Sequence, residues 1–124
     1  MKRVEAVVRH HKLQTVLEAL DKFGVSGVTV LDSSGFGRQR GHSEVFKGSE
    51  ESFGLVLKRT LILYVADEDV EGIVDCICQA ARTGQVGDGK LVVTNIERAV
   101  RIRTGEEADK VVAMDEVEPP PVST

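Results

Sequence analysis

The chain has 124 residues, a formal net charge of −4, 41% hydrophobic residues and 29% charged residues, which suits one globular domain and not a disordered chain. The negative net charge argues against non-specific nucleic-acid binding, which depends on an excess of Lys and Arg. No apolar run approaches the roughly 20 residues of a membrane-spanning helix. Charges interrupt the N-terminus, where a secretory signal would need an apolar stretch. We therefore expect a cytoplasmic protein without a membrane segment of its own.

The first half of the chain, taken in order, predicts a strand, a helix and two more strands. Residues 2–8 alternate between apolar and polar positions, which is typical of a half-buried strand. Residues 13–20 follow helical spacing, and Gly24 is a suitable end for that helix. Residues 27–32, with the sequence GVTVLD, predict a second strand, and the largely apolar residues 55–65 predict a long, buried third strand.

The second half predicts another helix and one or two strands. Asp67 is a suitable N-cap for a helix whose apolar stripe begins at Val70 and which ends near residue 83. Residues 91–94 predict a fourth strand, and residues 101–104 predict a short fifth strand.

The predicted order is β-α-β-loop-β-α-β, the split βαβ pattern of the ferredoxin-like fold. We therefore expect an α+β domain at residues 1–108, with an antiparallel sheet and two helices on one of its faces. Residues 35–54 show no strand or helix period and are too long for an ordinary connection, so they predict a functional or disordered loop. Residues 109–124 are acidic and include all 3 prolines, which predicts a flexible tail. Because the strands are apolar, we expect another copy of the chain to cover the sheet's second face.

The sequence GQVGDGK at residues 84–90 matches the first positions of the phosphate-binding pattern GxxxxGK. Leu91 stands where that pattern needs Ser or Thr, and a helix precedes the turn where a strand would be required. The glycines still allow backbone N–H groups to approach an anion, and Lys90 adds a positive charge. A plain connection between a helix and a strand is the alternative.

Arg101 and Arg103 stand two residues apart, so in a strand they would point to the same face while Ile102 faced the core. Two close guanidinium groups repel each other unless an anion or carboxylates lie between them. A solvated charged face is the alternative interpretation. Together with Lys90, which also flanks the last predicted strand, the two arginines favour a polyphosphate site.

The stretch GFGRQRG at residues 35–41 again combines glycines with arginines. Its spacing is GxGxxxG and no helix follows, so it does not support a dinucleotide-binding unit. No catalytic set emerges from the chain: the serines lack a recognisable base partner, and the histidines do not follow a zinc-binding spacing. The sequence therefore favours a binding protein over an enzyme.

Three stretches together resemble the PII signal-transduction family of nitrogen regulators: GFGRQRGHSE at 35–44, QAARTGQVGDGK at 79–90 and RIRTGE at 101–106. The resemblance covers roughly residues 1–108 without gaps. It implies a homotrimer with ATP or ADP in each cleft between neighbouring subunits, and a mobile, partner-reading T-loop at about residues 37–55.

The resemblance also implies the residues of the ligand site. The nucleotide would contact glycines and charged or polar side chains of two subunits, namely Gly27, Thr29, Gly35, Gly37, Arg38, Tyr64, Gly87, Asp88, Gly89, Lys90, Arg101 and Arg103. The effector 2-oxoglutarate would contact Gln39, Lys58 and Gly87. Gln39 would also be a ligand of Mg²⁺, which would bridge ATP and 2-oxoglutarate.

Several positions depart from the family pattern. Glu51 replaces the tyrosine that is uridylylated in some members, which excludes that modification here. Ser49 matches a serine that is phosphorylated in some cyanobacterial relatives, with an unmodified serine as the alternative. Ile62 and Thr60 replace a common Glu and a common Lys, which leaves the nucleotide preference open.

The sequence therefore predicts a non-catalytic signal transducer that senses adenine nucleotide and 2-oxoglutarate and regulates targets of nitrogen metabolism. Lys47 and Gly48 are the expected partner contact at the loop tip, with an ordinary exposed lysine as the alternative. The resemblance implies partners such as an ammonium transporter, which would recruit the protein to a membrane, or N-acetylglutamate kinase. A PII-like sensor of a different second ligand, and a weak ATPase, are the alternative functions.

Overall fold

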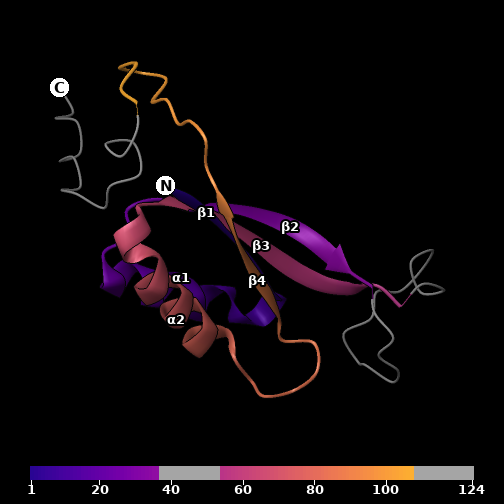
Figure 1. Ribbon diagram of the computed structural model, residues 1–124. Helices are drawn as coiled ribbons and strands as arrows, with labels where there is room; N and C mark the ends of the chain where they lie inside the picture. The colour runs from indigo at the N-terminus through magenta and orange to yellow at the C-terminus, as the bar shows by residue number, and fades with distance from the viewer. Residues whose placement is uncertain (37–53, 108–124) are drawn as a thin grey trace, which may run out of the picture.

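The computed structural model describes residues 1–36 and 54–107. In chain order these residues form β1 (Lys2–Arg9), η1 (His10–Lys12), α1 (Leu13–Phe23), β2 (Thr29–Gly35), β3 (Val56–Val65), η3 (Asp67–Asp69), α2 (Val70–Ala81) and β4 (Gly89–Asn95). The strands form one antiparallel sheet in the order β2-β3-β1-β4, and both α-helices lie on the same side of it (Figure 1). This is the ferredoxin-like α+β fold that the sequence predicts, and the prediction is confirmed.

Strand β1 is central to the sheet, because it pairs along its length with β3 on one side and with β4 on the other. Its sequence KRVEAVVR alternates, so successive side chains point to opposite faces of the sheet. Val4, Ala6 and Val8 point toward the helices and are buried.

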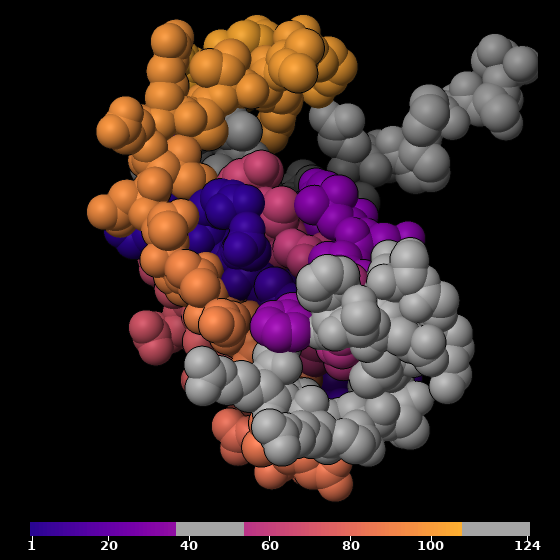
Figure 2. Space-filling model, turned by 90° about the vertical axis from the view of Figure 1, so that its right-hand side faces the viewer, coloured from indigo at the N-terminus to yellow at the C-terminus, as the bar shows by residue number. Residues whose placement is uncertain are grey.

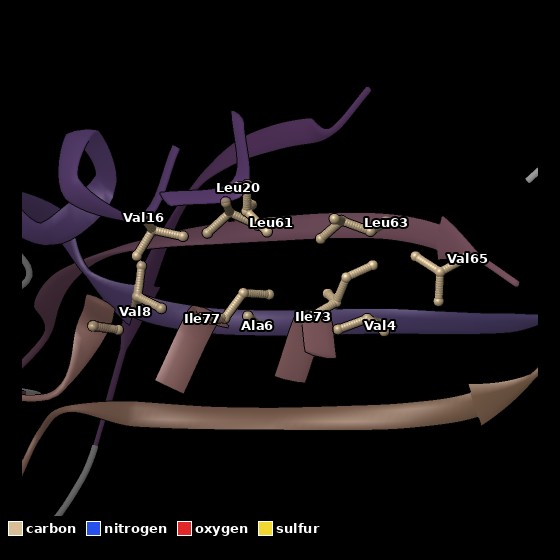
Figure 3. Packing of buried hydrophobic residues seen from close by; sticks show 11 residues of the cluster. Val4, Ala6, Val8, Val16, Leu20, Leu61, Leu63, Val65, Ile73 and Ile77 are labelled. Carbon is tan, nitrogen blue, oxygen red and sulfur yellow. The ribbon is translucent and has the colours of Figure 1, made fainter. Parts of the chain in front are cut away.

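The core lies between this face of the sheet and the two helices (Figure 3). Its strand residues alternate in sequence, whereas its helix residues are spaced three or four apart, as one-sided burial of each element requires. Its largest fully buried side chains are Leu20, Leu61, Leu63, Ile73, Ile77, Val4 and Val16. Full burial of one such Leu or Ile contributes roughly 1.5–3 kcal/mol to folding, so this cluster is a main source of the domain's stability.

The predicted helix boundaries are partly right. Gly24 ends α1 as expected, with a left-handed φ of 107° and an N–H that donates to the Leu20 carbonyl oxygen at 3.2 Å. Asp67 is not the N-cap of α2, because it is the first residue of the short helix η3, and Asp69 takes the N-cap position. The Asp67 carboxylate instead accepts a hydrogen bond of 2.8 Å from the amino group of Met1.

The sheet face away from the helices carries large apolar side chains that stay partly exposed. Leu31 on β2 is 48% exposed, Tyr64 on β3 is 55% exposed and Val92 on β4 is 46% exposed. Spread over three strands, they leave this face without the apolar cover that the helices give to the other. No helix in the described ranges has the length and apolar character needed to cross a membrane.

The segment after β4 does not form the predicted fifth strand. Residues 96–107 contain turns and an isolated bridge, and Ile102, which was expected to face the core, is 99% exposed. The Arg101 N–H donates to the Glu106 carbonyl oxygen, and the Gly105 N–H donates to the Arg101 carbonyl oxygen, both at 2.8 Å. These local hydrogen bonds close the segment on itself, so its backbone groups are not available to pair with the sheet.

Candidate ligand-binding site

A cavity of about 320 Å³ lies where β2 ends and β3 begins. Its walls come from β1, β2, β3, β4 and the turn before β4, and they consist of Val7, Gly35, Phe36, Gly54, Val56, Lys58, Gly87, Gly89 and Lys90. The fold therefore joins three features that are far apart in the sequence: the start of the GFGRQRG stretch, Lys58 and the GQVGDGK turn.

Lys58 and Lys90 reach this cavity from the two strands that flank β1. Lys90 lies opposite Val7 in the pairing of β1 with β4, and Val7 points away from the core because its neighbour Val8 is buried. The Lys58 ammonium donates a hydrogen bond to the Gly87 carbonyl oxygen, which ties the turn to β3. Two ammonium groups beside glycine backbone suit a carboxylate or phosphate ligand.

The turn before β4 is organised by the Asp88 carboxylate. It accepts hydrogen bonds from the N–H groups of Thr83 and Gly84, both at 2.8 Å, from the Thr83 hydroxyl, and from Arg9 Nε at 3.0 Å. These bonds, with the Thr83 hydroxyl as the largest contribution, hold the pKa of Asp88 well below its ordinary value, although burial acts in the opposite direction. The carboxylate therefore shapes the turn, and the predicted contact of Asp88 with a nucleotide stays a prediction.

Arg9 is a site residue that the sequence analysis missed. Only 6% of it is exposed, and its Nη2 donates to the Val86 carbonyl oxygen at 2.9 Å while its Nε binds Asp88. These partners are 77 and 79 residues away along the chain, so no local pattern could reveal the contact. Arg9 thus fastens the turn to the central strand.

We expect Asp88→Asn to destabilise the protein by about 2 kcal/mol at pH 7, because it weakens the bonds of a carboxylate that neutralises the buried Arg9. The folded-state pKa of Asp88 is lowered, so its contribution to stability is complete above about pH 5 and decreases as the pH falls through the acid range. Urea denaturation followed by circular dichroism gives the free energy of unfolding of the native protein and of the variant. The difference between these two free energies should become smaller as the pH falls toward about pH 3.

The matched control is Asp75→Asn, on the exposed side of α2, which should leave the denaturation midpoint at pH 7 unchanged. If the difference in free energy of unfolding between the native protein and Asp88→Asn stayed constant from neutral to acidic pH, this result would contradict the role assigned to the Asp88 carboxylate.

The other predicted site residues in the described ranges lie at the opposite end of the sheet. Thr29 begins β2 and Gly27 lies just before it. Tyr64 lies near the end of β3, and Arg101 and Arg103 lie beyond the end of β4. Figures 1 and 2 show the segment after β4 and the turn before β4 at opposite ends of the molecule.

The predicted cluster of Lys90 with the two arginines therefore does not form within one chain. The strand from Lys90 to Asn95 alone separates them by about 17 Å, at a rise of about 3.4 Å per residue. Six further predicted site residues lie outside the described part of the chain: Gly37, Arg38, Gln39, Lys47, Gly48 and Ser49.

Comparison with known proteins gives a consistent result. The sequence model of the family described as "Nitrogen regulatory protein P-II" matches residues 1–106. A protein named Nitrogen regulatory protein P-II from Bradyrhizobium diazoefficiens is 46% identical over 106 residues, which cover 86% of this chain and 95% of that protein. One of the same name from Haemophilus influenzae is 43% identical over 112 residues, which cover 90% of this chain and 100% of that protein.

Among solved structures, the crystal structure of Arabidopsis thaliana PII bound to citrate is similar, with a TM-score of 0.73 and 37% identity. The match covers 88% of this chain and 89% of that one.

The chain forms a small ferredoxin-like domain with a cavity lined by lysine side chains and glycine backbone. The chain belongs to the P-II family of nitrogen regulatory proteins.

Proposed function

We propose that this protein is a non-catalytic signal transducer that binds ATP or ADP and, together with Mg-ATP, 2-oxoglutarate, in clefts between the subunits of a homotrimer. Ligand binding would change the conformation of the loop at about residues 37–55 and thereby regulate targets of nitrogen metabolism. The observation that carries this proposal is the division of the predicted ligand contacts between the two ends of the sheet. One end carries Lys58, Lys90 and the glycine turn, and the other carries Thr29, Arg101 and Arg103.

A site between two subunits would bring together the two groups of predicted contact residues, one group from each subunit. In a closed ring such as a homotrimer, the interfaces are heterologous, so each subunit presents one surface patch to one neighbour and a different patch to the next. The exposed apolar residues Leu31, Tyr64 and Val92 favour such an assembly, because a neighbouring copy would cover them.

The composition of the cavity supports binding without catalysis. Among its described walls there is no His, Ser, Cys or carboxylate side chain to act as a nucleophile or a general base with an ordinary pKa. The similar Arabidopsis protein is described as bound to citrate, a polycarboxylate, which agrees with lysines that would meet the carboxylates of 2-oxoglutarate.

Partner binding forms the second part of the proposal. Lys47 and Gly48 at the loop tip would contact a target such as an ammonium transporter or N-acetylglutamate kinase, and Ser49 would be available for phosphorylation. The protein would work in the cytoplasm and reach a membrane only through such a transporter. Residues 1–108 would be the folded domain, and residues 109–124 a flexible tail.

The order of ligand binding follows from charge. ATP carries about four negative charges and 2-oxoglutarate two, and at about 5 Å each like-charge pair costs roughly 3 kcal/mol with an effective dielectric constant of about 20. Bare ATP should therefore exclude the second anion. When bound, Mg²⁺ would supply positive charge and accept oxygen ligands from both molecules, with Gln39 as its protein ligand. Lys58 would neutralise a carboxylate of 2-oxoglutarate.

Titration calorimetry with 2-oxoglutarate tests this order in four backgrounds: ligand-free protein, ADP with Mg²⁺, ATP with EDTA, and ATP with Mg²⁺. We expect binding only in the last background, because ADP lacks the γ-phosphate that would help to hold the metal between the two ligands. Comparable affinity in any of the first three, or undiminished affinity in Gln39→Ala, would refute the proposed mechanism.

A further inference from the structure

A second cavity, of about 340 Å³, lies on the other side of the β2–β3 hairpin, toward the helices. Its walls are His10, Asp32, Ser33, Ser34, Leu57, Lys58 and Arg59. Arg59 lies opposite the buried Val8, so its side chain leaves β3 on the helix side. Lys58, one residue earlier, leaves β3 on the opposite face and lines both cavities.

The Arg59 guanidinium connects three elements in this second cavity. Its Nε donates to His10 Nδ1 of η1 at 3.2 Å, and its Nη1 lies 2.8 Å from Asp32 Oδ1 of β2. The Arg59 side chain is only 25% exposed, whereas that of Asp32 is 88% exposed. The arginine is therefore the enclosed centre of the arrangement, and Asp32 is its outer partner.

The contact between Arg59 and His10 exists in one protonation state only. His10 accepts the hydrogen bond through Nδ1, so that nitrogen must carry no proton. A proton on Nδ1 would turn the acceptor into a second donor and would place an imidazolium beside a guanidinium. Histidine is the side chain whose charge changes between pH 5 and 8.

The described residues that line this cavity include three charged side chains near His10. The charged groups other than Arg59 are Asp32, which already pairs with Arg59, and Lys58, which is a cation. The residues that adjoin His10 along β1 and η1 are basic, namely Arg9, His11 and Lys12.

We propose that His10, Arg59 and Asp32 form a proton-sensitive latch, closed when His10 is neutral and opened by its protonation. The closed latch holds η1, β2 and β3 together beside the ligand cavity. Because Lys58 and Arg59 are consecutive residues of β3, and because β2 continues from Asp32 to Gly35, a change at the latch reaches two walls of that cavity through the same strands.

Amide hydrogen exchange, followed by nuclear magnetic resonance on the ligand-free protein, tests the latch. Protection factors, which correct for the intrinsic effect of pH on exchange, are compared at pH 7.5 and pH 5.5 for the amides around Asp32 and Arg59. We expect protection to fall by about threefold at the lower pH, the size of effect that a partly exposed charged contact supports. Amides of the β1–β4 pair serve as the internal reference and should not follow this fall.

Two variants locate the effect. His10→Gln offers a carbonyl oxygen to Arg59 but does not titrate, so its protection at Asp32 and Arg59 should be the same at both pH values. His11→Gln, the matched control at the neighbouring position, should keep the native response. Native protection that did not change with pH, or an undiminished fall in His10→Gln, would overturn the proposal. Since no ligand is present, the result does not depend on the nucleotide site.

Discussion

Gly89→Ala should destabilise the domain by roughly 3 kcal/mol or more, enough to deplete soluble, folded protein. A Cβ atom at this position would lie 1.7 Å from the Val7 carbonyl oxygen and 2.8 Å from the Val7 carbonyl carbon, and the φ of Gly89 is +102°. Both obstacles are backbone atoms of β1, which is held between β3 and β4 and cannot withdraw. Glycine at this position therefore lets β4 approach the central strand.

Gly84→Ala is the matched control in the same turn. Gly84 also has a positive φ, of +86°, but nothing lies within 4 Å of the position that a Cβ atom would take there. The variant should lose only about 1 kcal/mol, the usual cost of a left-handed conformation for a residue with a side chain. Urea denaturation of both variants separates backbone strain from steric overlap. Equal stability of the two variants would show that the close approach of Gly89 to Val7 does not matter.

Lys90→Ala and Arg103→Ala should each weaken the binding of ATP and ADP about tenfold or more, because each removes a charged hydrogen-bond donor to phosphate. Titration calorimetry measures both affinities. Lys22→Ala, on the exposed side of α1, is the control and should bind both nucleotides as the native protein does. Unchanged affinity in Arg103→Ala would mean that the two arginines form only a solvated face.

A mixing experiment tests whether these two residues act across subunits. If Lys90 of one subunit and Arg103 of its neighbour share a cleft, every mixed trimer refolded from the two variants contains one cleft with both native residues. Tight nucleotide binding should then return in the mixture. If the site lay within one chain, every subunit of the mixed trimer would lack either Lys90 or Arg103, and tight binding would not return. Failure to recover tight binding in verified mixed trimers would therefore exclude the shared cleft.

The sequence predicts those elements whose burial is one-sided. β1 alternates cleanly, and the apolar stripe of α2 follows the helical period, because each presents one face to the core. The second strand is predicted at residues 27–32, but β2 runs from Thr29 to Gly35, since its last residues pair with β3 through backbone groups and need no apolar side chains. The pattern of apolar and polar side chains in a sequence does not indicate pairing that is made through backbone groups.

The candidate site shows the same distinction. Gly87, Gly89 and Lys90 are predicted from their glycine-rich turn and do line the cavity, together with Lys58. Arg9 is missed because its role depends on a tertiary contact with Asp88. The segment around Ile102 is predicted as a strand because alternation of charged and apolar residues cannot distinguish a strand from a turn that closes through its own hydrogen bonds.

The central position of β1 has a consequence for synthesis on the ribosome. β1 precedes the other elements of the sheet in the chain, yet both of its partners come much later, since β3 begins at Val56 and β4 begins at Gly89. Until β4 emerges, one edge of β1 has no partner, and an unpaired edge is a surface on which chains associate incorrectly. The nascent chain therefore cannot complete its sheet before nearly the whole domain has been translated, and this topology favours slow folding over local, early folding.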